Sequence, residues 1–176
     1  MDKQLATDLQ RGCDALELSL DPVQRGLLLD YLGLLIKWNK AYNLTAVRDP
    51  GQMVSRHLLD SNGKKTRFLF QVKTALRLDN MTVHHERVES FRPERPFDAV
   101  LSRAFASLQD MMAGCRHLLT PEGRFLAMKG VYPTDELEAI KAQYDLQAVY
   151  PLAVPGLAEQ RHLVEIKFRQ GTDYIK

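Results

Sequence analysis

Only two cysteines, Cys13 and Cys115, occur among the 176 residues, and they form no closely spaced pair. A disulfide framework is therefore disfavoured, and a reducing compartment is favoured. No apolar run is long enough to span a bilayer, because Asp30 interrupts the best candidate, GLLLDYLGLLI. The opening residues, MDKQLATDLQRG, carry acids and lack an apolar core, which does not fit a signal peptide. We therefore expect a soluble, cytoplasmic protein that does not bind membranes.

The ten glycines include no Gly-x-Gly, so the sequence contains neither a dinucleotide fingerprint nor a phosphate-binding loop. No Ser/His/Asp arrangement is visible. His84 and His85 are adjacent, but neighbouring residues of a strand point to opposite faces and do not easily bind one metal together. Cys115 lies in a helical pattern, which favours a core position over a nucleophile. We expect no metal site.

A chain of 176 residues suits one domain, or one domain with a small helical appendage, and its 45% of apolar residues can form a sizeable core. The net charge of +2 is unevenly distributed. Residues 62–104 hold nine Lys and Arg against five Asp and Glu, and the segments on either side each carry a net charge of −1. A basic middle segment is typical of polyanion binding, and equally of solvated helix faces.

The first 60 residues follow a helical pattern. One helix is predicted to begin with Asp21 as its N-cap and Pro22 as its first residue, and a second with Asp49 and Pro50. The apolar positions of the first recur at helical spacing: Val23, Leu27, Tyr31, Leu34 or Leu35, and Trp38. We expect Trp38 to be buried and to pack this helical extension against the rest of the protein.

From Lys64 onward, helices alternate with strands. Helices are predicted in GKKTRFLFQVKTAL, SLQDMMAGCRHLL and TDELEAIKAQY, and strands in MTVHHERV, FDAVLSRAF, RFLAMKG, LQAVYPLAV and RHLVEIKF. FDAVLSRAF is apolar enough for a buried strand, and TPEG is a predicted turn. The alternation predicts a mostly parallel α/β sheet. The last two strands, joined at Pro155-Gly156, are expected to be antiparallel.

Two sets of polar residues are candidates for a binding site. Glu89 follows Val88 at the end of one predicted strand, and Arg103 ends the next. Ligands of open α/β sheets bind beyond the carboxyl ends of strands, although an ordinary loop ion pair is an equally good interpretation. The polar stretch Asn39 to Thr45 either caps its helix or meets a nucleic acid or a cofactor.

Seven stretches resemble the bacterial small-subunit ribosomal RNA guanine-N7 methyltransferases, a family also known as glucose-inhibited division protein B. They are WNKAYNLTAVRDP, RHLLDS, GKKTRFL, RVE, FDAVLSRAFASL, GRFLAMKG and QRHLVEIK, in family order, over nearly all of residues 15–168. The resemblance implies an α/β fold, that of a class I S-adenosylmethionine-dependent methyltransferase, with a Rossmann-like sheet and a helical N-terminal extension. The implied reaction is methyl transfer to N7 of a guanine in small-subunit ribosomal RNA.

The sequence departs from the family at Leu58–Ser61, LLDS. There the family has a first strand, a glycine-rich loop of the DVGTGPGLPG kind, a helix, and a second strand that also ends in an LLDS-like stretch. Here one LLDS serves both contexts, so a βαβ-type unit of roughly 30 or more residues is missing. An in-frame deletion between two LLDS copies would explain this, as would an incompletely assembled sequence. We expect a helical extension (1–60), an incomplete methyltransferase domain (61–170) and a tail (171–176).

Carried over by position, Val88 and Glu89 match family residues on the adenine side of S-adenosylmethionine, and Arg103 matches an arginine at the cofactor and substrate site. No catalytic residue is expected, because guanine N7 already carries a lone pair and needs alignment more than a base. The candidates for RNA binding are Lys64, Lys65, Arg67 and Lys129. Small-subunit ribosomal RNA, or the assembling small subunit, is the expected partner of a monomer. The alternative is a catalytically inactive RNA-binding remnant.

Overall fold

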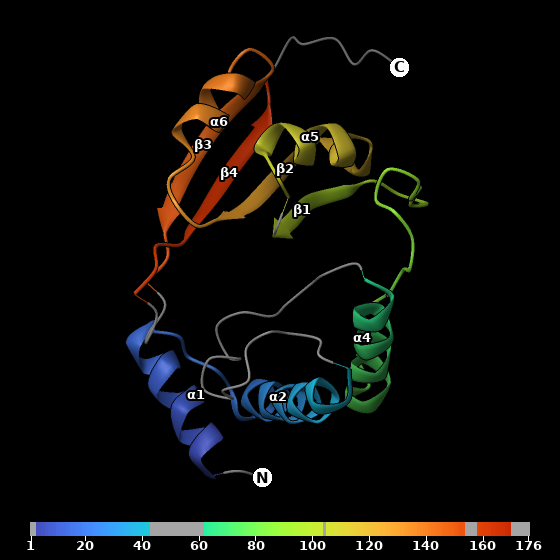
Figure 1. Cartoon of the computed structure of the whole chain (residues 1–176), viewed down its shortest axis with the longest axis vertical. Helices are drawn as coiled ribbons and strands as arrows, with labels where there is room; N and C mark the ends of the chain where they lie inside the picture. The colour runs from blue at the N-terminus through green and yellow to red at the C-terminus, as the bar shows by residue number, and fades with distance from the viewer. Residues whose placement is uncertain (1–2, 43–61, 104, 154–157, 170–176) are drawn as a thin grey trace. The chain divides into compact units, whose positions relative to one another are not determined.

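The structure is a computed structural model that describes residues 3–42, 62–103, 105–153 and 158–169. The chain forms two compact units, one built mainly from the residues up to His85 and the other mainly from Glu86 onward. Each unit is described by itself below (Figure 1). In the part of the chain described, no helix is both long enough and apolar enough to cross a membrane.

The first unit is helical and comprises α1 (Lys3–Ala15), α2 (Pro22–Tyr42) and α4 (Gly63–Leu76). The predicted start of α2 is confirmed. Asp21 accepts the Gln24 N–H at 2.9 Å, and the Gln24 side chain accepts the Asp21 N–H at 3.0 Å, so the two residues form a reciprocal capping box. The predicted helix from Asp49 lies outside the described residues, as does most of the polar stretch that follows Asn39.

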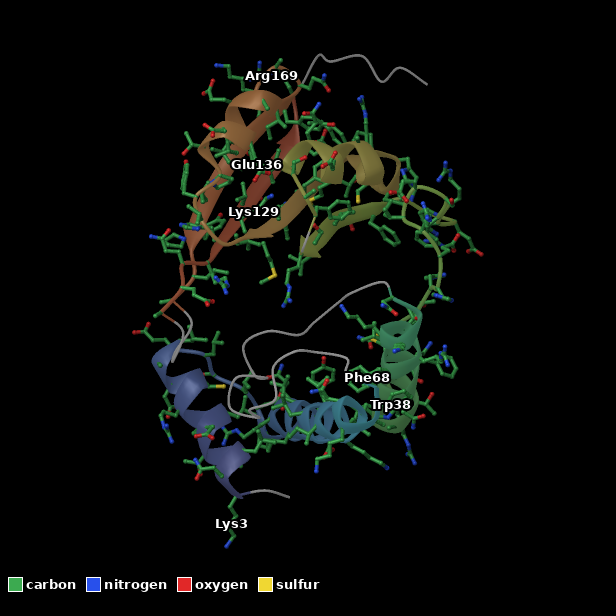
Figure 2. All side chains as sticks on the ribbon, viewed as in Figure 1. Lys3, Trp38, Phe68, Lys129, Glu136 and Arg169 are labelled. Atoms are coloured by element: carbon green, nitrogen blue, oxygen red, sulfur yellow. The ribbon has the colours of Figure 1, made fainter. Side chains whose placement is uncertain are left out.

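Apolar side chains from all three helices form the core of this unit. Its buried members are Leu5, Leu9 and Cys13 of α1, Leu29, Leu32 and Leu35 of α2, and Phe68 and Val72 of α4. Trp38 is half-buried at the edge of this core, where its ring lies 5.9 Å from that of Phe68 (Figure 2). The tryptophan therefore packs α2 against α4 and is only partly buried.

The second unit contains a four-stranded sheet with the order β1-β2-β4-β3. Its elements are β1 (Phe97–Arg103), α5 (Leu108–Cys115), a 3-10 turn (Arg116–Leu118), β2 (Leu119–Lys129), α6 (Thr134–Ile140), β3 (Tyr144–Pro151) and β4 (His162–Phe168). Among the strands of the described residues, β1 and β2 are parallel, whereas β4 is antiparallel to both β2 and β3. The expected antiparallel pair is confirmed, but the sheet described here is mixed and not mostly parallel.

The core of the sheet unit lies between the sheet and helices α5 and α6. Phe125, Val164 and Ile166 from the two central strands are fully buried there, as are Leu108 and Met111 of α5. Cys115 belongs to the same core, with 1% of its surface exposed, which confirms its expected core position. The core thus covers the middle of one face of β2 and β4.

Two predictions about strands, one for MTVHHERV and one for FDAVLSRAF, were wrong. MTVHHERV forms no strand: residues 81–87 are irregular, and a turn follows at Val88–Ser90. FDAVLSRAF does contain a strand, but β1 is an edge strand with mostly exposed residues and not a buried one. FDAVLSRAF has the apolar composition of a strand with a neighbour on each side, whereas MTVHHERV is mostly polar. The described structure supplies β1 with one neighbouring strand and residues 81–87 with none.

The predicted turn TPEG lies inside β2, where it interrupts the pairing with β1. Phe97 pairs with Leu119, but Ala99 pairs with Arg124, so the intervening residues of β2 bulge out of register. A Cβ at Gly123 would lie only 2.9 Å from the carbonyl oxygen of Thr120. The chain folds back closely on itself there, and a glycine is required.

Candidate functional site at the carboxyl ends of β1 and β2

The carboxyl ends of the two parallel strands bring two predicted site residues to one edge of the sheet. Arg103 is the last residue of β1 and Lys129 the last of β2, and Arg103 is in register with Met128. Helix α5 begins with Leu108, shortly after β1, so its N-terminus lies on the connection that leaves this edge. The arrangement matches the position at which open α/β sheets bind ligands.

Glu136, in the first turn of α6, connects the elements at this edge. Its carboxylate oxygens lie 2.7 and 2.9 Å from the ammonium group of Lys129, and one of them accepts the Leu108 N–H at 2.6 Å (Figure 2). Only 14% of the Lys129 side chain is exposed, so the ion pair is largely shielded from water. One carboxylate therefore fixes the end of β2, the start of α5 and the start of α6 relative to one another.

The start of α5 is also capped locally. Ser107 precedes the helix in an extended conformation, and its hydroxyl accepts the Asp110 N–H at 3.0 Å. The same hydroxyl donates to the Asp110 carboxylate at 2.7 Å. Together with Glu136, this cap uses two of the N–H groups that a helix N-terminus leaves without backbone partners.

On the far side of Lys129, the turn after β2 is anchored to β4. Lys129 pairs with His162, whose Nδ1 lies 2.7 Å from the carbonyl oxygen of Gly130. The Tyr132 ring meets the His162 ring edge-on at 5.9 Å. These contacts hold the chain between β2 and α6 and thereby help to place Glu136.

Val88 and Glu89 lie in a turn that packs against α5. A Cβ added at Gly114 would lie 3.7 Å from Val88 Cγ1 and 3.9 Å from Glu89 Oε1, so the glycine permits this close approach. Arg92 donates to the Glu89 carbonyl at 2.8 Å and closes the turn. Burial, and then the charge of Glu89, raise the pKa of the Cys115 thiol to about 11. A thiol that stays protonated and buried is a poor nucleophile.

The other three predicted RNA-binding residues lie in the helical unit. Asn62 caps α4 by accepting the Lys64 N–H at 3.0 Å, so the basic residues occupy the first turns of the helix. Lys64 and Arg67 are exposed and Lys65 is half-buried. The guanidinium of Arg67 donates to the Gly63 carbonyl at 3.2 Å. The structure therefore places these three cations in one unit, and Arg103 and Lys129 in the other.

One histidine of the adjacent pair lies against helix α4. A Cβ at Gly63 would lie 3.0 Å from Nε2 of His85, so this imidazole packs over the start of α4. Among the described residues, no group of three or more His, Cys, Asp or Glu side chains is arranged to hold a metal ion.

Sequence reasoning missed Glu136, although it carries the best-connected side chain at this edge. Its helix was predicted from TDELEAIKAQY, but none of the acids in that stretch was singled out. The available signal was Lys129 near the end of the predicted strand RFLAMKG, because an ammonium group that is buried there needs a carboxylate nearby.

The family model and the individual relatives that match this chain carry the same name. The family model for GidB, rRNA small subunit methyltransferase G, matches residues 24–62 and 58–164. A protein of Pseudomonas paraeruginosa named ribosomal RNA small subunit methyltransferase G is 47% identical over 203 residues, which cover 92% of this chain and 95% of the relative. Proteins of the same name from Ectopseudomonas mendocina and Stutzerimonas stutzeri are each 46% identical over 204 residues, with the same coverage.

Two details of these matches concern the LLDS stretch. The two family matches overlap at residues 58–62, so the same residues align with two different places in the family model. In addition, 92% of 176 residues is about 162, so about 40 of the 203 positions aligned with the Pseudomonas paraeruginosa protein have no residue from this chain. Both details agree with the internal gap expected at LLDS.

Proposed function

Because the chain belongs to the GidB family of small-subunit ribosomal RNA methyltransferases G, we propose that it acts on small-subunit ribosomal RNA. The proposed reaction is methyl transfer from S-adenosylmethionine to N7 of a guanine, on a class I methyltransferase fold. The identity of 47% over almost the whole chain is the observation that carries this proposal.

The chemistry of guanine N7 suits a site without a catalytic acid or base. The nitrogen already carries a lone pair, so the protein needs only to align it with the methyl group that is transferred. When bound, S-adenosylmethionine supplies this methyl group on a positively charged sulfur. The contribution that we assign to this chain is the placement of the base and of the RNA backbone.

We assign the placement of the RNA and the cofactor to the residues predicted from the sequence, but we now regard Lys129 as a weaker candidate. Arg103, exposed at the end of β1, is the best candidate to contact the base or a ligand carboxylate. Lys64, Lys65 and Arg67 form a basic group suited to RNA phosphates. Lys129 is a weaker candidate for RNA, because its ammonium group already lies 2.7 Å from Glu136. Val88 and Glu89 keep their proposed role on the adenine side of the cofactor.

The residues present do not make a complete cofactor site. Val88 and Glu89 are held in a defined turn against α5, but no Gly-x-Gly exists anywhere in the sequence to bring the backbone close to the cofactor. This mismatch, with the gap of about 40 positions, favours a second candidate function. In that case the chain binds ribosomal RNA through its basic residues without transferring a methyl group.

Titration calorimetry with S-adenosylmethionine tests the choice between these functions. Two proteins are compared: the chain as it stands, and the chain with the missing segment of the Pseudomonas paraeruginosa relative inserted between residues 58 and 62. We expect weak or no binding by the first and clear binding by the second. Tight binding by the first would mean that the chain folds a cofactor site without a glycine-rich loop, and the second candidate would be discarded.

Methylation of small ribosomal subunits that lack the modification tests the reaction itself. In the chain with the inserted segment, Arg103→Ala should abolish methyl transfer while changing stability by no more than roughly 1 kcal/mol, as is usual for an exposed side chain. Arg124→Ala is the matched control, because Arg124 is an exposed arginine on the neighbouring strand that bonds to Glu165. Equal losses of activity in both variants would contradict the role of Arg103.

A further inference from the structure

The free edge of β1 is the feature of the sheet unit that the proposed function leaves unused. In the described structure β1 pairs with β2 on one side and with no strand on the other. On that side β1 pairs with no strand of the described residues, and its seven residues give an edge about 24 Å long. Such an edge is a template for pairing with another chain.

The two faces of β1 differ. Ser102 points toward α5, since its hydroxyl contacts the sulfur of Met111 at 3.0 Å, and Val100 packs against the core on the same face. Side chains alternate along a strand, so Ala99 and Leu101 point to the opposite face. Leu101 is 45% exposed there, whereas the Phe97 ring stacks on Phe91 at 6.3 Å. An added strand would cover part of this apolar surface.

The other edge of the sheet is protected, whereas that of β1 is not. Strand β3 ends at Pro151, and its pairing with β4 shifts register between Leu146 and Ala148. A proline and an irregular register both hinder the addition of a strand. Strand β1 contains neither proline nor lysine, and the shift in its pairing comes from extra residues in β2.

We propose that β1 pairs antiparallel with β1 of a second copy of this chain, across a twofold axis through Val100, so that one sheet continues through both copies. This register gives the longest overlap and is self-complementary. It places Phe97 opposite Arg103, Asp98 opposite Ser102, and Ala99 opposite Leu101, with no like charges facing each other. An antiparallel dimer closes on itself and leaves no further β1 edge, in contrast to the monomer expected from the sequence.

The relatives supply a reason why this edge is open here. They carry about 40 aligned positions that this chain lacks, and the overlap of the family matches puts the gap at residues 58–62. A segment of that length is sufficient for a strand with its connection. The second copy of the chain would occupy the edge that such a strand could otherwise fill.

Sedimentation velocity over a wide concentration range tests the proposal. We expect a species of twice the 20.1 kDa chain mass that dissociates on dilution. Two double variants at exposed positions probe the register. Ala99→Glu with Leu101→Glu opposes two pairs of like charges, and Ala99→Glu with Leu101→Lys opposes two pairs of unlike charges. We expect roughly tenfold weaker association in the first and near-normal association in the second.

Hydrogen exchange gives a second readout that does not depend on the variants. The amides of residues 97–103 should become more protected as the protein concentration rises, while those of β3 should not change. A chain that remains monomeric at every concentration would overturn the proposal. So would larger open-ended assemblies, or a dimer that both double variants weaken equally, because the charges would then not face each other in this register.

Discussion

Replacing Glu136 with alanine should destabilise the sheet unit by about 2 kcal/mol. The substitution removes the acceptor of the Leu108 N–H at 2.6 Å and the partner of Lys129 at 2.7 Å. Removing one member of a buried ion pair costs roughly 3–5 kcal/mol, because the other charge is left without a partner. We take a lower value because 31% of the Glu136 side chain is exposed, so water already screens part of the interaction.

A double-mutant cycle separates the ion pair from the rest of the effect. Lys129→Met should cost only about 1 kcal/mol, since Glu136 is the more exposed partner and keeps the Leu108 N–H. The double variant should be more stable than the sum of the single losses predicts, because the two charges interact directly.

Urea unfolding and hydrogen exchange of the β2 amides measure these changes. The fluorescence of Trp38, the single tryptophan, follows the helical unit separately. A loss below about 0.5 kcal/mol for Glu136→Ala, which is typical of plain surface positions, would refute the reasoning, as would strictly additive losses in the cycle.

Two further predictions follow from the two cores. Trp38→Ala should destabilise the helical unit by about 2 kcal/mol, which is less than the roughly 3–5 kcal/mol lost when a fully buried ring is removed, and Trp38→Phe should cost less still. Hydrogen exchange of the α4 amides measures the effect, because Trp38 contacts α4 through Phe68. The pKa of Cys115 is raised from 9.0 to about 11, so the unfolded thiol releases its proton first and stability should fall between these pH values, by up to about 3 kcal/mol. Cys115→Ala should flatten that part of the stability profile in denaturant titrations.

Local signals in the sequence predicted most of the elements correctly. The Asp21 and Pro22 start of α2, the apolar spacing of α4 and the tight antiparallel pair β3 and β4 depend on residues close together in the chain. The predicted carboxyl-edge position of Arg103 depends on the same local information. Such features are recognisable because the residues that determine them are adjacent.

The features that sequence reasoning missed depend on residues far apart. The contact between Glu136 and the Leu108 N–H joins residues 28 positions apart, and nothing near either one indicates the other. The mixed sheet arises because β4 inserts between β2 and β3. Whether β1 is central or at an edge is decided by other strands, so its own apolar composition could not show that one side is open.

The two wrong strand predictions share a physical cause that can be tested. A strand needs neighbours, and both residues 81–87 and the free edge of β1 would gain them from a segment that fills the gap at residues 58–62. With the Pseudomonas paraeruginosa segment inserted there, we expect slower hydrogen exchange in residues 81–87 and 97–103 at low protein concentration. An insertion of equal length made of Gly and Ser is the control, because it adds chain without strand-forming residues. Equal exchange with the two insertions would show that the missing segment is not the reason for the open edge, and the apolar character of β1 would then need another explanation.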